Sequence, residues 1–341
     1  MAIEIIATGR AVPPNKVTNE DLAERIDTTD EWIRSHTGIG ARHVAASGIA
    51  CSDLSLEAAR EALNAAAQGG KGSPEELAQS LDLIILGTTT PDYLGVPPTA
   101  CLVQDKLGAK NAGALDIAAA CTGFIYGLEL AAAFLMVNKD RKRALVIGTD
   151  VLSRIVNWDD RGTAVLFGDG SGAVLIEKTD APAGGPGGRG LVRTILKADG
   201  SGAESLIIRQ GGSRNPFKAG DVVAIPPYLE MNGHAVYTFA VKALTGIIER
   251  LLKEEGITIG DVARIIPHQA NARIVQAAGK RLGIPEDKFF LNIEEYANTS
   301  AASIPIALDE LNRAGKLKKG DLLMTVGFGG GLTYGGNLII W

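Results

Sequence analysis

The sequence predicts an α/β fold built from two similar halves. Short β-branched runs alternate with Ala/Leu-rich helical patterns, which is typical of a largely parallel sheet covered by helices on both faces. The order of these elements repeats, and a glycine-rich segment closes each repeat. The predicted buried strands are 83–86, 145–147, 174–176, 265–266 and 322–326, and the predicted helices are 55–68, 122–137, 236–255 and 273–282.

The repeat divides the chain at a Pro/Gly-rich stretch, 181–190, which has the composition of a linker. In residues 1–180, strands at 82–86 and 114–117 lead to Cys121 and a helix, followed by a strand at 144–148 and a glycine-rich hairpin at 167–174. In residues 191–341, strands at 264–266 and 289–293 lead to Asn298 and a helix, followed by a strand at 322–327 and a glycine-rich segment at 329–336. We therefore expect Cys121 and Asn298 at equivalent junctions, facing one another.

Composition narrows the functional classes. The 341 residues are 46% hydrophobic, which fits a soluble globular protein, and the formal net charge of -5 argues against nucleic-acid binding. The N-terminus lacks the pattern of a signal peptide, and the longest mostly apolar run, 124–137, contains Glu129 and is short for a membrane span. Three cysteines without CxxC spacing and four scattered histidines predict free thiols in the cytoplasm and no metal site.

Cys121 follows small residues and precedes a long helical pattern. At a strand-to-helix junction, unpaired N–H groups and the helix dipole favour the thiolate, the nucleophilic form of cysteine. The alternative interpretation is a buried structural cysteine, the commoner role of an isolated one. Cys51 and Cys101 lack such a setting, so we expect them to be structural.

Two further residues strengthen the nucleophile interpretation. His268 follows a short apolar strand, and ligands of parallel sheets gather at the carboxyl ends of strands, although a hydrogen-bonded core histidine fits as well. Asn298 alone is better explained as a capping or turn residue. Together with Cys121 they form a specific set, which also fits a hydrolase of the cysteine-protease type. The segment 327–331 can bring a backbone N–H of Gly330 toward a thioester oxygen, with the N–H of Cys121 as second oxyanion donor, or it is simply a tight hairpin turn.

Several long motifs in the same order resemble β-ketoacyl-acyl-carrier-protein synthase III of the thiolase-like superfamily. They are residues 27–33, 36–39, 116–124, 160–163, 167–170, 267–271, 298–303 and 328–331, and the resemblance covers essentially the whole chain. It implies a duplicated, five-layered α/β/α/β/α fold that normally dimerises. It also implies decarboxylating condensation of an acyl-CoA primer with malonyl-acyl carrier protein, which initiates type II fatty-acid synthesis without a further cofactor.

The resemblance assigns roles residue by residue. Cys121 resembles the nucleophile, His268 and Asn298 resemble the groups that stabilise the malonyl-derived enolate, and Cys121 and Gly330 resemble the oxyanion donors. Trp32 and Arg161 match residues that sandwich the CoA adenine. Other matches along the CoA channel are Thr28, Gly162, Gly233, His234, Tyr237, Ala270 and Asn271. Arg273, Lys280 and Arg281 match the surface that meets acyl carrier protein, although their charge pattern alone indicates only an exposed helix face.

Some positions depart from the pattern. His36 stands where arginine is usual, His234 where asparagine is usual, and Tyr237 where phenylalanine is usual. These differences weaken the expectation that acyl-CoA is the acyl donor. Val96 falls where a bulky Phe of the dimer partner closes the acyl pocket, so we expect room for longer or branched acyl groups. A specialised condensing enzyme or acyltransferase of secondary metabolism is the main alternative, and a cysteine hydrolase and a non-catalytic subunit are two others.

Overall fold

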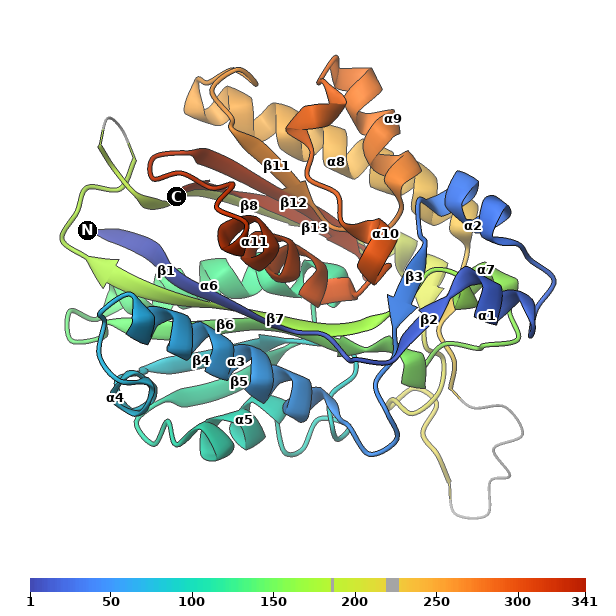
Figure 1. Ribbon diagram of the computed structural model, residues 1–341, viewed down its shortest axis with the longest axis horizontal. Helices are drawn as coiled ribbons and strands as arrows, with labels where there is room; N and C mark the ends of the chain where they lie inside the picture. Colours follow the sequence, from blue (N-terminus) through green and yellow to red (C-terminus); the bar gives the residue numbers. More distant parts are fainter. Residues whose placement is uncertain (185–186, 219–226) are drawn as a thin grey trace.

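Two sheets form the frame of the molecule (Figure 1). The computed structural model describes residues 1–184, 187–218 and 227–341. The first sheet has the strand order β1-β7-β6-β4-β5, with bounds β1 Ala2–Ala11, β4 Leu83–Gly87, β5 Gly113–Ile117, β6 Arg143–Val151 and β7 Asp169–Thr179. The second has the order β11-β12-β13-β8, with bounds β8 Gly190–Ala198, β11 Arg264–Pro267, β12 Leu322–Gly329 and β13 Thr333–Ile340. Two small ribbons pair β2 (Lys16–Thr18) with β3 (Ala41–His43) and β9 (Leu206–Ile207) with β10 (Glu230–Met231).

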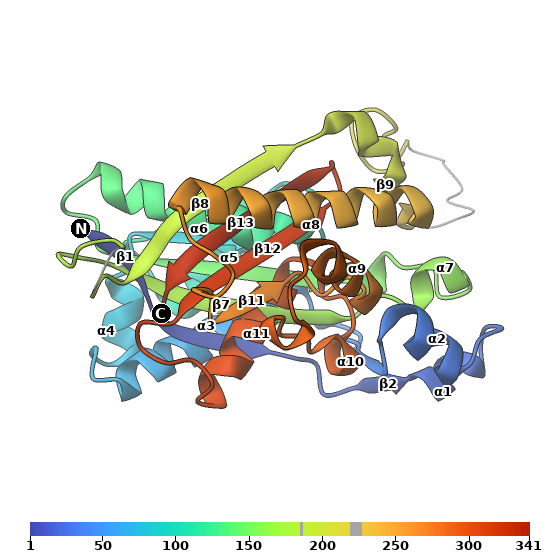
Figure 2. The same ribbon diagram turned by 90° about the horizontal axis from the view of Figure 1, so that it is seen from above.

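Helices cover both faces of each sheet and so produce five layers. On the outer side of the first sheet lie α3 (Cys51–Gln68) and α5 (Thr99–Leu107). Between the sheets lie α6 (Gly123–Val137) and α11 (Ser303–Arg313). Outside the second sheet, α8 (Gly233–Glu255) lies over β12 and β13 beside α9 (Ala272–Leu282) (Figure 2). This arrangement confirms the predicted duplicated α/β/α/β/α fold.

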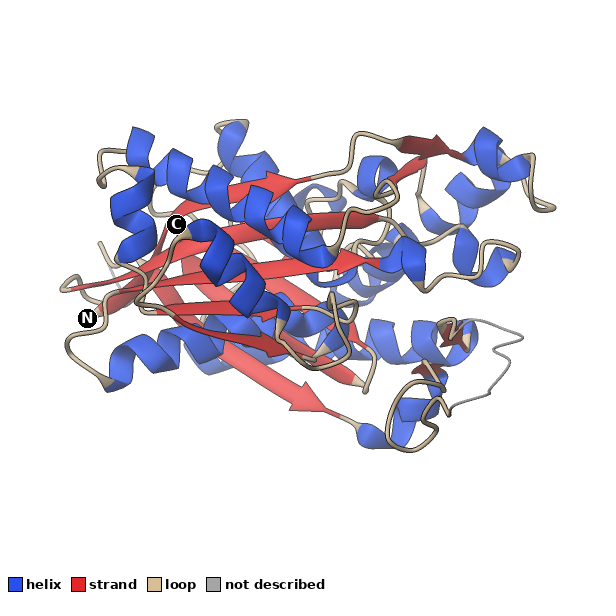
Figure 3. Cartoon of the chain, turned by 90° about the horizontal axis from the view of Figure 1, so that it is seen from below, coloured by secondary structure: helices blue, strands red, loops and turns tan. Residues whose placement is uncertain are grey.

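The remaining helical segments are short. The α-helices are α1 Asn19–Ala23, α2 Asp30–Thr37, α4 Pro74–Gln79, α7 Arg161–Ala164 and α10 Ile293–Tyr296. The 3-10 turns are η1 Ala120–Thr122, η2 Leu152–Arg154, η3 Gly200–Ser205, η4 Glu286–Lys288 and η5 Ser300–Ala302. Several of these segments gather beyond one end of the strands, away from both chain termini (Figure 3).

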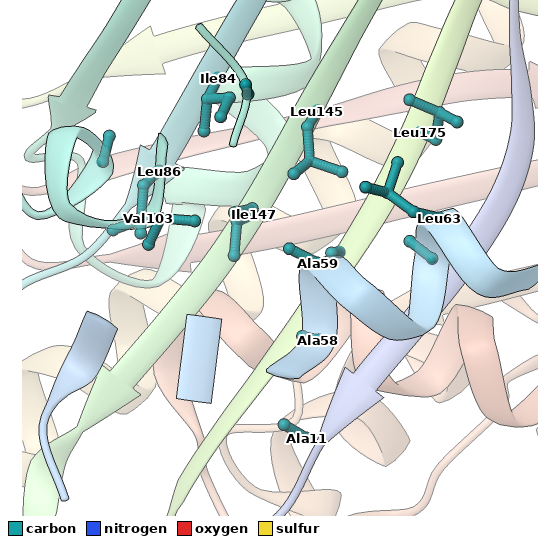
Figure 4. Packing of buried hydrophobic residues seen from close by; sticks show 14 of the residues in the cluster. Ala11, Ala58, Ala59, Leu63, Ile84, Leu86, Val103, Leu145, Ile147 and Leu175 are labelled. Atoms are coloured by element: carbon teal, nitrogen blue, oxygen red, sulfur yellow. The ribbon is translucent and has the colours of Figure 1, made fainter. Parts of the chain in front are cut away.

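Small residues allow α3 to lie close to the first sheet. Ala58, Ala59 and Leu63 face buried strand residues such as Leu145 and Leu175, and all are essentially inaccessible to solvent (Figure 4). A second cluster fills the space between the sheets, and a third lies beneath α8 and α9. The core therefore consists of three apolar layers that alternate with two sheets. Burial of this apolar surface stabilises the fold.

The apolar composition of α6 follows from its central position. The segment 120–137, which consists of the turn η1 and α6, has a mean hydropathy of 1.7 and is long and apolar enough to cross a membrane. This corrects the expectation that the run is too short. However, 56% of the segment is buried within the fold, between two sheets, and a helix buried on opposite sides needs apolar residues on both.

Three sequence-based predictions need correction. Residues 289–293 do not form a strand, because only Phe289 makes an isolated bridge, to Ile265. The glycine-rich stretch 167–174 is not a hairpin, since β7 begins at Asp169 and runs on as one strand. Cys121 is equivalent to Ala301 rather than Asn298, because each follows a residue with positive φ, Ala120 (+46°) and Ser300 (+52°), in the 3-10 turn that precedes a central helix.

Candidate active site

Two cavities meet at Cys121. The first, of about 240 Å³, is lined by residues of both halves, among them Cys121, His268, Asn298 and Phe328. The second, of about 280 Å³, shares Cys121, Phe167 and Leu206 with the first and is mostly apolar, with Leu152, Ile155, Ile208 and Leu229 also in its wall. The thiol is therefore placed where one molecule can reach it from the first cavity while an apolar chain extends into the second.

Parallel strands bring the reactive residues together. Cys121 follows the carboxyl end of β5, and His268 follows the carboxyl end of β11. Each strand runs parallel to a neighbour, β4 for β5 and β12 for β11. Because Cys121 and His268 line one cavity, the carboxyl ends of β5 and β11 lie at the same end of the molecule. This is the general location of binding sites in α/β folds.

The Cys121 thiol is buried and protonated. Burial raises the pKa of Cys121 to about 12, a hydrogen bond with Ser300 opposes the rise, and the charge of Asp150 adds to it. The prediction that the helix favours the thiolate is therefore wrong for the unliganded site. The physical reason is that Cys121 lies in η1, before α6 begins at Gly123, where loss of solvent outweighs the partial charge of the helix end.

His268 is buried and neutral. Burial lowers the pKa of its imidazole to about 3. Its Nδ1 lies 2.7 Å from Oγ of Ser303, which in turn accepts a hydrogen bond from the backbone N–H of Gln269 at 3.4 Å. The ring packs edge-on against Phe328, with centroids 5.5 Å apart. A neutral imidazole held in this way can donate from one nitrogen to a substrate oxygen without changing its charge.

Asn298 is held by segments of both halves. Its backbone N–H donates to the carbonyl of Leu166 at 3.0 Å, and its carbonyl accepts from the N–H of Gly168 at 3.0 Å. Its side-chain Oδ1 accepts from the N–H of Ser300 at 2.9 Å, so the amide NH₂ group is the part left to face a ligand. The glycine-rich segment that begins at Phe167 thus has a structural purpose, because a side chain at Gly168 would collide with the carbonyl of Tyr296.

The glycine-rich end of β12 lies against Cys121. A Cβ atom at Gly329 would lie 2.7 Å from the backbone N of Cys121, so this approach requires glycine. The next residue, Gly330, lines the second cavity together with Cys121. This neighbourhood is suited to two backbone N–H donors directed at one oxygen.

The outer end of the first cavity is aromatic and basic. The guanidinium of Arg161 lies over the Trp32 ring, 4.7 Å from its centroid. The His36 ring also stacks on Trp32, with centroids 4.3 Å apart and planes 17° apart. A flat purine ring could enter between Trp32 and Arg161 only if the guanidinium moved away, since two stacking contacts need a wider gap.

Comparison with known proteins identifies the family. Residues 115–206 match the family model 3-oxoacyl-[acyl-carrier-protein (ACP)] synthase III, and residues 252–341 match the model for the C-terminal part of the same enzyme. A β-ketoacyl-[acyl-carrier-protein] synthase III of Clostridium perfringens is 48% identical over 336 residues, which are 98% of each chain. One of Natranaerobius thermophilus is 47% identical over 338 residues, which are 99% of each chain.

The chain belongs to the β-ketoacyl-acyl-carrier-protein synthase III family.

The fold agrees with this membership. The crystal structure of 3-oxoacyl-[acyl-carrier-protein] synthase III from Aquifex aeolicus superimposes with a TM-score of 0.87 at 41% identity, covering 99% of this chain and all of the other. As a member of the synthase III family, the chain is an acyl-transferring condensing enzyme.

Most of the residues matched to the synthase III pattern line the first cavity. These are Cys121, His268, Asn298, Trp32, Arg161, Gly162, Gly233, Tyr237, Ala270 and Asn271. Thr28 and His234 are not among its lining residues, and the Thr28 hydroxyl is buried without a hydrogen-bond partner among the described residues. Val96 lines neither cavity and is 83% exposed. Arg273, Lys280 and Arg281 lie exposed on α9.

Three residues near the site were missed from the sequence. Ser303 contacts His268, Ser300 lines the second cavity beside Cys121, and the buried Asp150 bonds Thr89, which also lines the second cavity. Ser300 and Ser303 lie in a segment, 298–303, that was noted only as a family motif. Asp150 had a signal of its own, because a charged residue in the buried apolar strand β6 needs hydrogen-bond partners.

Proposed function

We propose that this chain starts fatty-acid synthesis by joining an acyl-CoA primer to malonyl-acyl carrier protein, with Cys121 as the covalent acyl carrier. In the first step the sulfur of Cys121 attacks the thioester carbonyl of acyl-CoA. The carbon–sulfur bond to CoA breaks, and the thiol proton ends on the CoA sulfur. The N–H groups of Cys121 and Gly330 stabilise the oxyanion of this step. The free CoA then leaves and malonyl-acyl carrier protein binds, so the kinetics are ping-pong.

His268 and Asn298 act in the second step. The malonyl group loses CO₂, and the resulting enolate oxygen accepts hydrogen bonds from the imidazole N–H and from the amide NH₂ group. The enolate carbon attacks the acyl-Cys121 carbonyl, a carbon–carbon bond forms, and the Cys121 sulfur leaves as a thiolate, which takes a proton from solvent to restore the thiol. Because His268 is neutral and Asn298 is not titratable, neither donor changes with pH over the physiological range. The steps use no cofactor besides the two thioester substrates.

The two cavities suggest how the substrates are placed. The pantetheine arm enters through the first cavity, with Trp32 and Arg161 at the adenine and Tyr237 along the channel. Thr28 and His234 lie outside the lining of this cavity, so they can contact CoA only beyond it. The acyl chain lies in the second cavity, whose apolar wall fits a primer longer than acetyl. Arg273, Lys280 and Arg281 contact the acidic carrier protein through exposed basic side chains.

A homodimer completes this proposal. Exposed apolar side chains gather on the segment 93–96, with Leu94 79% exposed and Val96 83% exposed. Strand β5, at the edge of the first sheet, also exposes Leu115. An open edge and an apolar loop are both surfaces that a second copy of the chain would cover. We propose that Val96 then approaches the acyl cavity of the partner.

One observation carries the assignment of the residues: Cys121, His268 and Asn298 line a single cavity, and Cys121 also lines a second, mostly apolar cavity. A cysteine hydrolase would need a base able to take the thiol proton and water at the acyl-enzyme. The buried, weakly basic His268 fits hydrogen-bond donation better.

The test is intact-protein mass spectrometry after incubation with acetyl-, isobutyryl- and longer acyl-CoA. A mass gain equal to the acyl group is expected, and Cys121→Ala should show none. Cys51→Ala is the matched control, because Cys51 is a buried thiol whose pKa burial raises in the same way, outside both cavities that contain Cys121. It should be acylated like the wild type. Absence of any acyl adduct would contradict acyl-CoA as the donor, and the donor that labels best identifies the primer class.

A further inference from the structure

Asp150 is a buried charged group that the proposed chemistry does not use. It lies near the carboxyl end of β6, and its side chain is inaccessible to solvent. Burying a carboxylate is costly unless hydrogen bonds replace the lost water. The partners of Asp150 therefore indicate what its position in the molecule is for.

One carboxylate oxygen binds the loop that follows β4. Oδ1 of Asp150 accepts from the backbone N–H groups of Thr89, at 2.7 Å, and Thr90, at 3.2 Å. The hydroxyl groups of Thr88, Thr89 and Thr90 also donate to this oxygen, at 3.1, 2.8 and 3.0 Å. The side chain thus holds three consecutive residues of the first half, and Thr89 lines the second cavity.

The other oxygen binds the second half. Oδ2 accepts from the backbone N–H of Ala301 at 3.3 Å, and the side chain of Ser300 is a further hydrogen-bond partner of the carboxyl group. Burial raises the pKa of Asp150, and the bonds from Ser300, Thr89 and Ala301 oppose this rise. Since three backbone N–H groups point at its two oxygens, the ionised form, which only accepts, fits these partners best.

The turn held in this way also carries the amide of Asn298. The N–H of Ser300 donates to Oδ1 of Asn298, and the next N–H, of Ala301, donates to Asp150. Ser300 has a φ of +52°, a conformation that costs a non-glycine residue energy and persists only where neighbours impose it. Asp150 supplies part of that restraint, from the opposite sheet.

We propose that Asp150 is a positioning residue for the condensation, which ties the Thr88–Thr90 loop to the Ser300–Ala301 turn and thereby sets Asn298 and the wall of the acyl cavity against Cys121. The proposal rests on the proposed function of Cys121 and Asn298. It assigns Asp150 no contact with substrate. Its effect is on the relative placement of two groups that come from different halves of the chain.

Asp150→Asn separates the two sets of bonds. An amide has one accepting oxygen, and the Thr88–Thr90 loop, with five donors, takes it. The amide NH₂ group then faces the N–H of Ala301, and two donors cannot bond. The substitution therefore removes the bond from Ala301 and leaves the turn only the Ser300 hydroxyl, which can accept from the amide NH₂ group, while it keeps the loop. Asp169→Asn is the matched control, because Asp169 is equally buried and accepts from Ala45 and Ser153, which line neither cavity at Cys121.

Three measurements compare the two variants: kcat and KM for condensation, decarboxylation of malonyl-acyl carrier protein without primer, and the pH profile of Cys121 alkylation by iodoacetamide. For Asp150→Asn we expect kcat and decarboxylation about tenfold or more below those of Asp169→Asn, with little change in KM for acyl-CoA, because misplaced catalytic groups slow chemistry more than binding. Loss of the negative charge should also lower the pKa of Cys121, so alkylation should shift to lower pH. Destabilisation that exposed Cys121 would also lower its pKa, so the two variants are compared at matched free energies of unfolding, where only loss of the Asp150 charge should shift the alkylation profile.

The outcomes are distinct. Equal kinetics and equal alkylation profiles for the two variants would overturn the proposal. If Asp150→Asn does not fold, Ser300→Ala takes its place, and wild-type decarboxylation by that variant would likewise overturn it, whereas a loss of about threefold or more supports it. If the wild type accepts no acyl group, the proposed function fails, but the alkylation profiles still test whether Asp150 acts on Cys121, because they need no substrate.

Discussion

Ser303 contacts Nδ1 of His268, and we propose that this contact selects which ring nitrogen can donate to a substrate. His268 is neutral, so only one ring nitrogen carries a proton. Oγ of Ser303 accepts from the N–H of Gln269 at 3.4 Å, and we propose that its own proton is donated to Nδ1, 2.7 Å away. With Nδ1 as the acceptor, the ring proton lies on Nε2. This is the tautomer that enolate stabilisation requires if Nε2 faces the cavity.

We expect Ser303→Ala to slow decarboxylation of malonyl-acyl carrier protein by roughly tenfold, the equivalent of about 1.4 kcal/mol for one lost hydrogen bond. Nitrogen-15 chemical shifts of His268 should show a mixture of tautomers in the variant and one tautomer in the wild type. Ser303→Thr keeps the hydroxyl group and should restore the rate. A single unchanged tautomer in Ser303→Ala would show that Ser303 does not select it.

The pKa of Cys121 illustrates how much a single residue depends on its surroundings. A cysteine before a helix is usually expected to be acidic. Here burial dominates, and the pKa rises to about 12. We therefore expect the thiol to lose its proton as the thioester reacts, rather than before. A thiol that is protonated at rest is also protected from adventitious oxidation, since the thiolate is the reactive form.

At the scale of elements, glycine residues allow strands β6 and β4 of the first sheet to lie close to the turn η5 and to the start of α6. Gly148 in β6 lies beneath the η5 turn, and a Cβ atom there would overlap the carbonyl of Ala301. Gly87 in β4 and Gly123 at the start of α6 are in similar mutual contact. Strand glycines normally weaken a sheet, so their presence here indicates a close backbone approach.

We expect Gly148→Ala to lower the free energy of unfolding by about 1–3 kcal/mol, since extra volume in a packed interior forces the turn and its neighbours to move. The condensation rate should fall more than the loss of stability explains, because the displaced turn contains Ser300, whose N–H holds the side chain of Asn298. Gly246→Ala in α8 is the control, since a Cβ atom there meets nothing within 4 Å. It should gain up to about 1 kcal/mol from its helix propensity. Urea unfolding measures the stability of the two variants, and kcat measures their condensation activity. Equal changes of these two quantities in Gly148→Ala and Gly246→Ala would contradict the proposed role of Gly148.

At the scale of the whole molecule, the buried His268 makes stability depend on pH. The unfolded chain binds a proton at His268 below about pH 6.5, whereas the folded protein excludes it down to about pH 3. The unfolded state therefore binds more protons in this window. As the pH falls through it, the free energy of unfolding falls by up to about 1.4 kcal/mol per pH unit from this residue.

His268→Gln should remove that contribution. Urea unfolding between pH 7 and pH 4.5 should show a shallower loss of stability in the variant than in the wild type. His43→Gln is the control, because His43 is only partly buried and lies outside both cavities at Cys121. Parallel pH dependences of wild type and His268→Gln would mean that His268 is protonated in the folded protein.

The proposed dimer is also a property of the whole molecule. We expect Leu94→Asp to weaken self-association, because a charge on the exposed 93–96 segment would be buried without a partner. Sedimentation velocity should detect a shift from dimer to monomer. Lys139→Asp, an exposed charge change at the end of α6 away from this segment, should leave the dimer intact. A monomeric wild type would refute the dimer and the placement of Val96 together.

Much of the fold was predictable from residue patterns. Alternation of apolar strands and amphipathic helices is a local property, because a strand or helix must bury its own apolar face, and both the layers and the strands at 83–86 and 322–326 follow from it. The motifs around Cys121, His268 and Asn298 could likewise be recognised in the sequence, because each motif is a short continuous segment. Residues 289–293 were misassigned as a strand because an apolar run of that length suits several environments.

The arrangement of the site depended on contacts between distant segments. The protonated state of Cys121, the bond from Ser303 to His268 and the two-sided bonding of Asp150 all join residues from different elements, many from different halves. Burial and hydrogen-bond partners set pKa values and orientations, and neither is encoded in local spacing. The sequence thus identified the fold and the family and predicted Cys121, His268 and Asn298 as reactive residues, whereas the packing of two sheets around η1 and η5 decided the charge states and geometry of these side chains.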